Sequence, residues 1–441
     1  MAVQDLRERR DQALAIRTCD EKGRNLRAHA ENVTGLLWYS GRMNLKNLTV
    51  VLGVCVLGGG LVSAQPKPAD KKMAEPAVDL AALADRIVTK TANVKEGEIV
   101  QIHAGPQDIA FAEELAVAVR KKGAHPILTY WSESAAKKMI AAAPEKYDGQ
   151  APAGDIGLAK LINVLITIPP VRDPSIAGAL PPARRAAQSK AGVVVGDISL
   201  KRSIRLVEVG NGMYPTPLRS KLTGQSEAEL GKVFWDGVSA DYAGIEDKAK
   251  SLKATLAAGS ELRITLPNGT DLKMKVKARK VLTSDGVISD ADIKAGGANV
   301  NAWLPAGEVY LTPVAGSAEG KIVDDRMVFE GKEVTGVTAE VKAGKITSIT
   351  AKTGWDGVKG VYDAAGAGKN EIGLVDFGIN PAVKAAPKNE TYVAAGMVTI
   401  GTGGNVWAGG TNKEPFSLQF FLTGATVTLD GKPIVEAGTL K

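Results

Sequence analysis

The chain has 441 residues, enough to bury more than one hydrophobic core, so two domains are expected. Its 55 Lys and Arg residues against 48 Asp and Glu give a formal net charge of +7. This mild excess, without a basic block interleaved with aromatic residues, argues against nucleic acid as a partner.

The segment before residue 65 predicts a leader rather than part of the fold. Met43–Lys46 is a short basic head, Leu48–Val62 is an apolar run, and the small-residue exit ends at Ala64. This pattern is typical of a secretory signal peptide at 43–64, cleaved after Ala64. The apolar run is short for a membrane span. We therefore expect an exported, periplasmic or extracellular protein that meets the membrane only through its signal peptide.

Two alternatives remain for the leader. Cys55 invites a lipoprotein interpretation, but Val54 before it is bulkier than that processing site usually accepts. Residues 1–42 precede a complete signal sequence, which favours a start codon assigned too early and Met43 as the initiator; the alternative is a cytoplasmic tail on an uncleaved anchor.

Removing residues 1–64 leaves 46 basic against 42 acidic residues, a net charge of +4, and takes away both cysteines, so no disulfide is expected.

After a polar linker at 65–76, helical and strand patterns alternate. Amphipathic or capped helices are predicted at 79–94, 107–122 and 132–143, with Gly123 ending the second and Ser132 as N-cap of the third. Strands are predicted at 96–103, 125–131, 161–168 and 203–209. This alternation predicts an α/β N-terminal domain over 77–225, a parallel sheet with flanking helices.

The pattern changes in the second half of the chain. Residues 226–258 are helical in pattern and bridge the domains. Beyond them, three hairpins are predicted: 261–266 with 272–276 around an Asn-Gly turn, 337–341 with 345–349, and 426–429 with 432–435. We therefore expect a β-rich α+β C-terminal domain over 259–441.

The segment Leu304–Pro313 carries the clearest candidate for chemistry. It places Glu308 between two prolines in a strand-like run, a good position for a metal ligand. The histidines of the chain are His29, His103 and His125, all far upstream. A metal site around Glu308 would therefore have no imidazole from its own half of the protein.

Several segments together resemble one family. In chain order they are Gly269–Leu272, Asn301, Leu304–Pro313, Gly373, Asn380-Pro381, Gly404-Asn405, Gly409-Gly410 and Ala425–Gly431. Their order and spacing are similar to those of the thermophilic metallo-aminopeptidases, the aminopeptidase T or leucyl aminopeptidase-like group, and their dihydroxypyridine-dioxygenase-like relatives. The resemblance implies an α/β domain, a β-rich domain that holds the metals, and a homodimer that encloses the active site.

The resemblance also implies where metal ligands would lie: two glutamates, two histidines and one aspartate. Glu308 matches the first glutamate and Glu371 the second, whereas Thr399 stands at the first histidine and Ser417 and Gln419 at a His-x-Asp pair. A one-residue slip would give Leu418 and Phe420 instead, and neither register restores a ligand pair. Gly307 occupies the position of a further glutamate, a candidate general base in the peptidases.

This ligand set changes the expected chemistry. Zinc-type hydrolysis needs about three imidazole or carboxylate ligands, and non-haem iron needs two histidines with one carboxylate. Two glutamates with hydroxyl and amide oxygens form a hard set that could hold calcium or magnesium weakly and suits zinc, cobalt or iron poorly. We expect a pseudoenzyme with a degenerate metal site, without a cofactor or with a weakly bound divalent metal, that binds a peptide-like or other small-molecule ligand.

Two other functions stay open. One is a working metal-dependent aminopeptidase, a hydrolase that uses zinc or cobalt with altered ligands. The other is a structural or envelope interaction protein that uses the dimer alone.

Other features have ordinary explanations beside the functional ones. His103 ends the first predicted strand, where open sheets often bind ligands, but a lone histidine there is more often a hydrogen-bonded loop residue. No helix clearly follows Gly401–Asn405, which favours a turn over a phosphate loop. Trp303, Trp355 and Trp407 could line a pocket or pack in a core.

Overall fold

The computed structural model describes residues 78–441 except 170–171, 173–175, 177–178 and 387. The expected leader at 1–64 and the linker at 65–76 lie outside these residues. Across the described part of the chain, no helix has the length and apolar character needed to cross a membrane.

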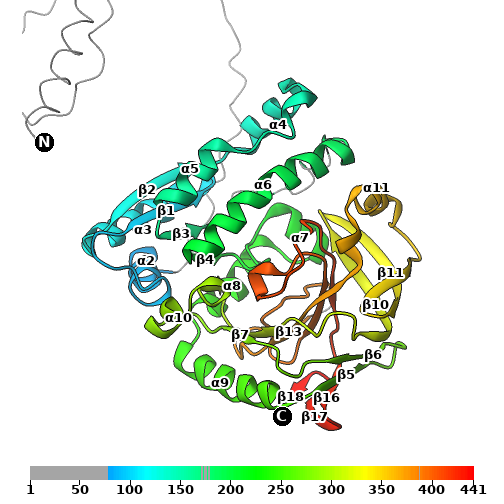
Figure 1. The fold of residues 1–441 in the computed structure, drawn as a ribbon. Coiled ribbons are helices and arrows are strands. Elements are labelled where there is room, and N and C mark those ends of the chain that lie inside the picture. The colour runs from blue at the N-terminus through cyan, green and yellow to red at the C-terminus, as the bar shows by residue number, and fades with distance from the viewer. Residues whose placement is uncertain (1–77, 170–171, 173–175, 177–178, 387) are drawn as a thin grey trace, which may run out of the picture. The chain divides into compact units, whose positions relative to one another are not determined.

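The N-terminal half forms a parallel sheet covered by helices, as the alternating pattern predicts (Figure 1). The strand order is β2-β1-β3-β4-β8, and every neighbouring pair is parallel. Four of these strands are β1 (Ile99–Ala104), β2 (His125–Tyr130), β3 (Val164–Thr167) and β4 (Arg205–Val209). The helices are α2 (Leu80–Arg86), extended by a π-helical turn at Ile87–Thr91, α3 (Ile109–Lys121), α4 (Glu133–Ala142), α5 (Ala153–Leu161) and α6 (Pro182–Arg202).

The fifth strand of this sheet comes from the second half of the chain. β8 (Asn301–Leu304) pairs in parallel with β4, with Leu206 opposite Asn301 and Val209 opposite Leu304. The family-like segment Leu304–Pro313 therefore begins at the last residue of a strand in the parallel sheet and leaves that sheet before it reaches Glu308.

Local signals account for several element ends. The Ser132 hydroxyl accepts a hydrogen bond from the Ala135 amide and caps α4, and Gly123 has a φ of +74° beyond α3, both as predicted. The predicted bridging helix is divided into α8 (Glu227–Val238) and α9 (Tyr242–Ala258). The Asp241 carboxylate caps α9 by accepting from two backbone amides, which starts a new helix there. α7 (Pro217–Thr223) precedes both.

The C-terminal half is β-rich, as expected, and contains two sheets. The larger sheet has the order β12-β11-β10-β6-β5-β16-β17-β18 and includes all three predicted hairpins. Its strands are β5 (Glu261–Thr265), β6 (Asp271–Lys275), β10 (Glu319–Phe329), β11 (Lys332–Lys342), β12 (Lys345–Thr350), β16 (Thr426–Leu429), β17 (Lys432–Glu436) and β18 (Thr439–Leu440).

The second sheet, which we call the site sheet, has the order β15-β14-β13-β9-β7. Its strands are β7 (Val281–Ser284), β9 (Glu308–Leu311), β13 (Ile372–Gly378), β14 (Val398–Thr402) and β15 (Gln419–Phe421); α10 (Asp290–Ala295) and α11 (Asp356–Ala364) are the helices of this half. Val309, Leu311, Val375 and Phe377 on one face pack into a core shared with the larger sheet. The alternate side chains of the same strands are free to line the opposite face.

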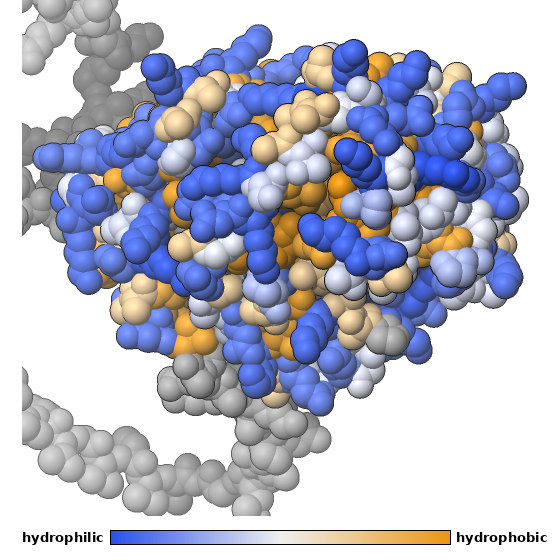
Figure 2. All heavy atoms as spheres, turned by 90° about the horizontal axis from the view of Figure 1, so that it is seen from below, coloured by the Kyte–Doolittle hydropathy of each residue, from blue (hydrophilic) through white to orange (hydrophobic). Residues whose placement is uncertain are grey.

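The surface seen in Figure 2 is largely hydrophilic. Apolar side chains are visible mainly near the middle of this face, where polar side chains frame them. Most of the large apolar side chains of the described residues are buried in the cores of the two halves.

Candidate functional site

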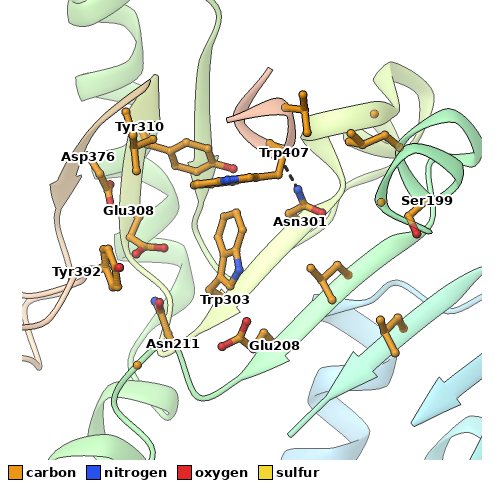
Figure 3. Close-up of a pocket in the computed structure, with 18 of the residues that line it drawn as sticks. Ser199, Glu208, Asn211, Asn301, Trp303, Glu308, Tyr310, Asp376, Tyr392 and Trp407 are labelled. Carbon is orange, nitrogen blue, oxygen red and sulfur yellow. Dashed lines mark hydrogen bonds between the residues drawn. The ribbon is translucent and has the colours of Figure 1, made fainter. Parts of the chain in front are cut away.

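A cavity of about 730 Å³ lies between the site sheet and the parallel sheet (Figure 3). Both halves of the chain supply its lining. The site sheet contributes Glu308, Tyr310, Leu374, Asp376 and Gln419; the parallel sheet and α6 contribute Leu165, Ser199, Leu200, Leu206, Glu208 and Trp303. A largely apolar cavity of this size with a few polar groups is typical of a small-molecule site.

The strand register brings polar residues together on one face of the site sheet. Tyr310 lies opposite Asp376, and Asp376 lies opposite Thr399. Glu308 lies two residues from Tyr310 on the same strand. Gln419 lies two residues from the position opposite Thr399. Because side chains alternate along a strand, both point to the same face as Tyr310, Asp376 and Thr399. Of the residues singled out in the sequence, Glu308, Thr399 and Gln419 therefore lie on the same face of the site sheet.

Glu371 lies elsewhere. It precedes Gly378, the residue opposite Glu308, by seven positions, which corresponds to roughly 20 Å along a strand. Its carboxylate accepts from the Asn412 amide at 3.1 Å and pairs with the Lys345 ammonium at 3.3 Å. The structure does not bring Glu371 to Glu308, and Asp376 is the carboxyl group that shares the cavity instead.

Ser417 lies next to Gln419, because the Gln419 amide donates to the Ser417 hydroxyl at 2.7 Å. The expected register of this segment thus places both side chains toward the same side. The alternative positions, Leu418 and Phe420, are buried in the core of the C-terminal half.

The carboxyl groups of Glu308 and Asp376 both have raised pKa values. Glu308 is only 4% exposed, and burial together with the nearby charge of Glu208 raises its pKa to about 8, although a hydrogen bond from the Asn211 side chain opposes the rise. Burial and the charge of Glu308 raise the pKa of Asp376 well above its usual range. Both effects follow from placing two like charges in an apolar surrounding.

Three polar atoms beside this pair are buried without a hydrogen-bond partner within the described structure: the Tyr310 hydroxyl, one Asp376 oxygen and the Thr399 hydroxyl. They come from neighbouring strands at paired positions. Because buried polar atoms usually have hydrogen-bond partners, a bound polar group would be expected to supply the missing partners of these three atoms.

Gly307 cannot carry the glutamate that the resemblance implies at this position. Its φ is +127°, and a Cβ there would come within 2.8 Å of the Asn380 backbone nitrogen. The Asn380 side chain is itself held by hydrogen bonds to the carbonyls of Ala306 and Gly237. The backbone therefore requires glycine directly before Glu308.

Sequence reasoning missed two acidic residues of the cavity, Glu208 and Asp376. Each is a single acid inside an apolar strand, Leu206-Val207-Glu208-Val209 and Leu374-Val375-Asp376-Phe377. A lone acid in such a run was the available signal, since buried carboxyl groups are rare without a role. Burial raises the pKa of Glu208 also, and its carboxylate accepts from the Asn211 backbone.

His103, His125 and the three tryptophans singled out in the sequence lie within the described residues. His103 lies in β1 with its Nδ1 3.0 Å from the Thr129 hydroxyl, and burial lowers its pKa; His125 begins β2. Trp303 and Trp407 line the cavity, whereas Trp355 packs against Tyr362 with ring centroids 5.3 Å apart. The ordinary explanation thus holds for Trp355, and the pocket interpretation for the other two tryptophans.

The cavity offers a metal ion mainly carboxyl, hydroxyl and amide oxygens. Over the described residues, no three His, Cys, Asp or Glu side chains are grouped so that they could hold a metal ion. Thr399 and Gln419 present a hydroxyl and an amide at positions where the resemblance implies an imidazole and a carboxylate. This donor set does not fit a hydrolytic zinc or cobalt centre.

The family model of the thermophilic metalloproteases (M29) matches residues 77–378. The chain belongs to this family. The matched range includes Glu308 and Asp376 and ends before Thr399 and Gln419.

Two solved structures share the fold. One is wild-type AmpT from Thermus thermophilus, with 21% identity, a TM-score of 0.64, and coverage of 82% of this chain and 98% of that one. The other is 2,5-dihydroxypyridine dioxygenase from Pseudomonas putida, with 14% identity, a TM-score of 0.54, and coverage of 82% and 96%. No curated protein matches the chain.

Proposed function

We propose that this chain is an exported M29-family pseudoenzyme whose cavity binds a small or peptide-like ligand without a catalytic metal centre. One observation carries the proposal: Glu308, Asp376, Thr399 and Gln419 lie on one face of the site sheet, and three of them, Glu308, Asp376 and Gln419, line the cavity. A hydrolytic centre needs imidazole or several carboxylates around one ion, and a hydroxyl with an amide are weak substitutes. In this proposal Asp376 replaces Glu371 as the second carboxylate.

The backbone at Gly307 supports the same conclusion. The peptidases resembled by this segment have a glutamate there as candidate general base, and the close Asn380 backbone leaves no room for a side chain. A base for activating water would therefore have to come from another element.

Calorimetric titration with zinc tests the proposal. Wild-type protein, first treated with chelator, should show no sub-micromolar zinc site. The variant Thr399→His, Ser417→His, Gln419→Asp should gain zinc affinity by orders of magnitude, because imidazole supplies much of the affinity of zinc sites. Adding Asp376→Asn should abolish the gain, whereas adding the matched Glu371→Gln should leave it.

Stoichiometric sub-micromolar zinc binding by the wild type, lost in Glu308→Gln, would contradict the proposal. Circular dichroism of each variant, with a thermal midpoint, checks that lost binding does not reflect unfolding.

A second candidate function is a working metal-dependent aminopeptidase with altered ligands. The row of unsatisfied oxygens at Tyr310, Asp376 and Thr399 favours it, because a hard cation could satisfy them. This candidate requires that zinc, cobalt or a harder ion activate hydrolysis of amino-acid amides. An assay with each ion, before and after chelation, decides between the two functions.

A further inference from the structure

The cavity is acidic without any basic counterpart. Glu208, Glu308 and Asp376 all line it, and the described lining residues include no lysine, arginine or histidine. None of the ion pairs formed within the described structure involves these three residues. Their polar neighbours include the neutral Asn211, which serves both Glu208 and Glu308.

An aromatic wall faces the same space. We use this term for Trp303, Tyr310 and Trp407, whose ring centroids lie 5.3 to 5.6 Å from one another. Figure 3 shows Trp303 between the carboxyl groups and Trp407. Trp407 is 36% exposed, a large apolar surface for a side chain that lines a cavity. Leucines of β3, β4 and α6 complete the apolar lining.

We propose that the cavity binds an organic amine: a ligand with a protonated amino group, an aromatic or aliphatic body and no carboxylate. The inference rests on the proposed function, because it needs the carboxyl groups to face the ligand rather than a metal. Ammonium groups are attracted both to carboxylates and to the faces of aromatic rings, and apolar burial of the body adds to the affinity. A carboxylate on the ligand would be buried beside acidic side chains with no lysine, arginine or histidine in the described lining to pair with it, so α-amino acids are disfavoured.

Glu208 is the residue that should receive the ammonium group. It lies in β4 on the parallel sheet, opposite Trp303 of β8, and Figure 3 shows its carboxyl group below the Trp303 ring. It is half-buried, and the hydrogen bond from the Asn211 backbone orients it. Unlike Glu308 and Asp376, which lie on the site sheet, Glu208 lies on the parallel sheet.

Three indole compounds test the inference by calorimetry on chelator-treated full-length protein. Tryptamine carries only the ammonium group, tryptophan carries both charges, and 3-indolepropionate carries only the carboxylate. We expect tryptamine to bind at least about 10-fold more tightly than either acid, because one unbalanced charge contact is worth roughly 1.4 kcal/mol or more. Equal or tighter binding of 3-indolepropionate or tryptophan would overturn the inference.

Variants locate the site. Glu208→Gln should weaken tryptamine binding about 10-fold and leave binding of neutral 3-methylindole unchanged, whereas Trp407→Leu should weaken both. Glu340→Gln, at an exposed position of β11, is the matched control and should change neither. Undiminished tryptamine binding by Glu208→Gln and Trp407→Leu would place the amine elsewhere and overturn the assignment.

The two proposals can fail separately. If the metal-free protein shows no preference for the amine and no zinc site, only the amine inference falls. If tryptamine binds only after zinc is added, the metal-free cavity of the proposed function is contradicted as well.

Discussion

Asp324 on β10 is a buried carboxyl group outside the cavity. It is 4% exposed; one oxygen accepts from the Arg326 amide at 3.0 Å, and the other has no partner within the described residues. Burial raises its pKa from 3.8 to about 7. The folded state therefore binds this proton more tightly than the unfolded state. The resulting stability is complete below pH 4 and is lost as the pH rises through 7.

We predict that Asp324→Asn removes this pH dependence. The difference in unfolding free energy between variant and wild type should shift in favour of the variant from pH 4 to pH 8, by at most about 4 kcal/mol, the equivalent of the pKa rise. Urea unfolding at several pH values measures it. Asp247→Asn, at an exposed position of α9, is the control and should show no such shift. A constant difference across pH would show that Asp324 does not titrate in this range.

Single residues of the site were predictable only in part. The order of segments singled out Glu308 and Thr399, and the structure places both on one face of the site sheet. Glu371 was matched by its position ahead of Gly373 and Asn380-Pro381, and the structure places it seven residues before Gly378, the residue opposite Glu308. Glu208 could not be linked to the site from the sequence, since it reaches the cavity from the other half of the molecule.

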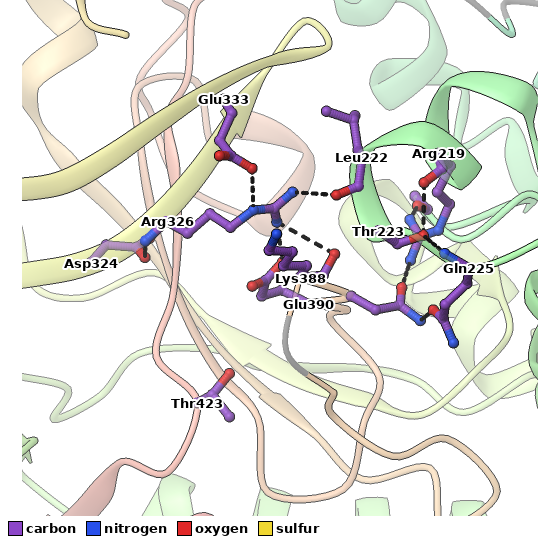
Figure 4. A network of polar contacts seen from close by, with 12 residues as sticks. Arg219, Leu222, Thr223, Gln225, Asp324, Arg326, Glu333, Lys388, Glu390 and Thr423 are labelled. Atoms are coloured by element: carbon purple, nitrogen blue, oxygen red, sulfur yellow. Dashed lines mark hydrogen bonds and ion pairs between the residues drawn. The ribbon is translucent and has the colours of Figure 1, made fainter. Parts of the chain in front are cut away.

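At the scale of elements, Arg326 joins α7 to the larger sheet (Figure 4). Its guanidinium pairs with Glu333 at 2.7 Å and Glu390 at 2.8 Å, and it donates to the carbonyl of Leu222 in α7 at 3.2 Å. The Arg326 side chain is only 12% exposed. One planar side chain with several donors thus holds three segments that are distant in sequence.

We predict that Arg326→Met destabilises the fold by roughly 2–4 kcal/mol, because Glu390 and the Leu222 carbonyl would be left without their partner in a partly buried place. Arg263→Met is the matched control: Arg263 pairs with Asp271 on the same sheet but both side chains are 49% exposed, so its loss should cost less than about 1 kcal/mol. Chemical denaturation of both variants measures the contrast. Similar losses in the two variants would contradict it.

Elements with strong local signals were predicted well, and those decided by distant contacts were not. The hairpin of β5 and β6 follows from alternation and an Asn-Gly turn. α6 went unpredicted because its 21 residues include Gly192, Gly196 and three consecutive valines, which are poor helix formers. β8 is four residues long, and its pairing with β4 is a long-range contact that no local pattern reveals.

At the scale of the whole molecule, the expected domain organisation places a leader before the described fold. If residues 43–64 are a signal peptide, as expected from the sequence, the exported protein begins at Gln65. Intact-mass analysis of protein recovered from the producing cell's exterior or periplasm checks this, with allowance for cyclisation of the terminal glutamine. A mass that includes any of residues 1–42 would reject it.

The homodimer implied by the resemblance also stays a prediction, and mass photometry at several concentrations tests it.

The position of β8 has a consequence for how the protein is made. During synthesis, β4 is complete about 90 residues before its partner β8 leaves the ribosome, a delay of roughly 5–20 s. Throughout that interval one edge of the parallel sheet has unpaired backbone groups, the arrangement that invites association with other chains. If the leader directs export of the unfolded chain, as proposed, the parallel sheet would not form with an unpaired edge during synthesis. A chaperone that keeps the nascent chain unfolded would have the same effect. A fragment ending before Asn301 should therefore aggregate, however well its own helices and strands are specified.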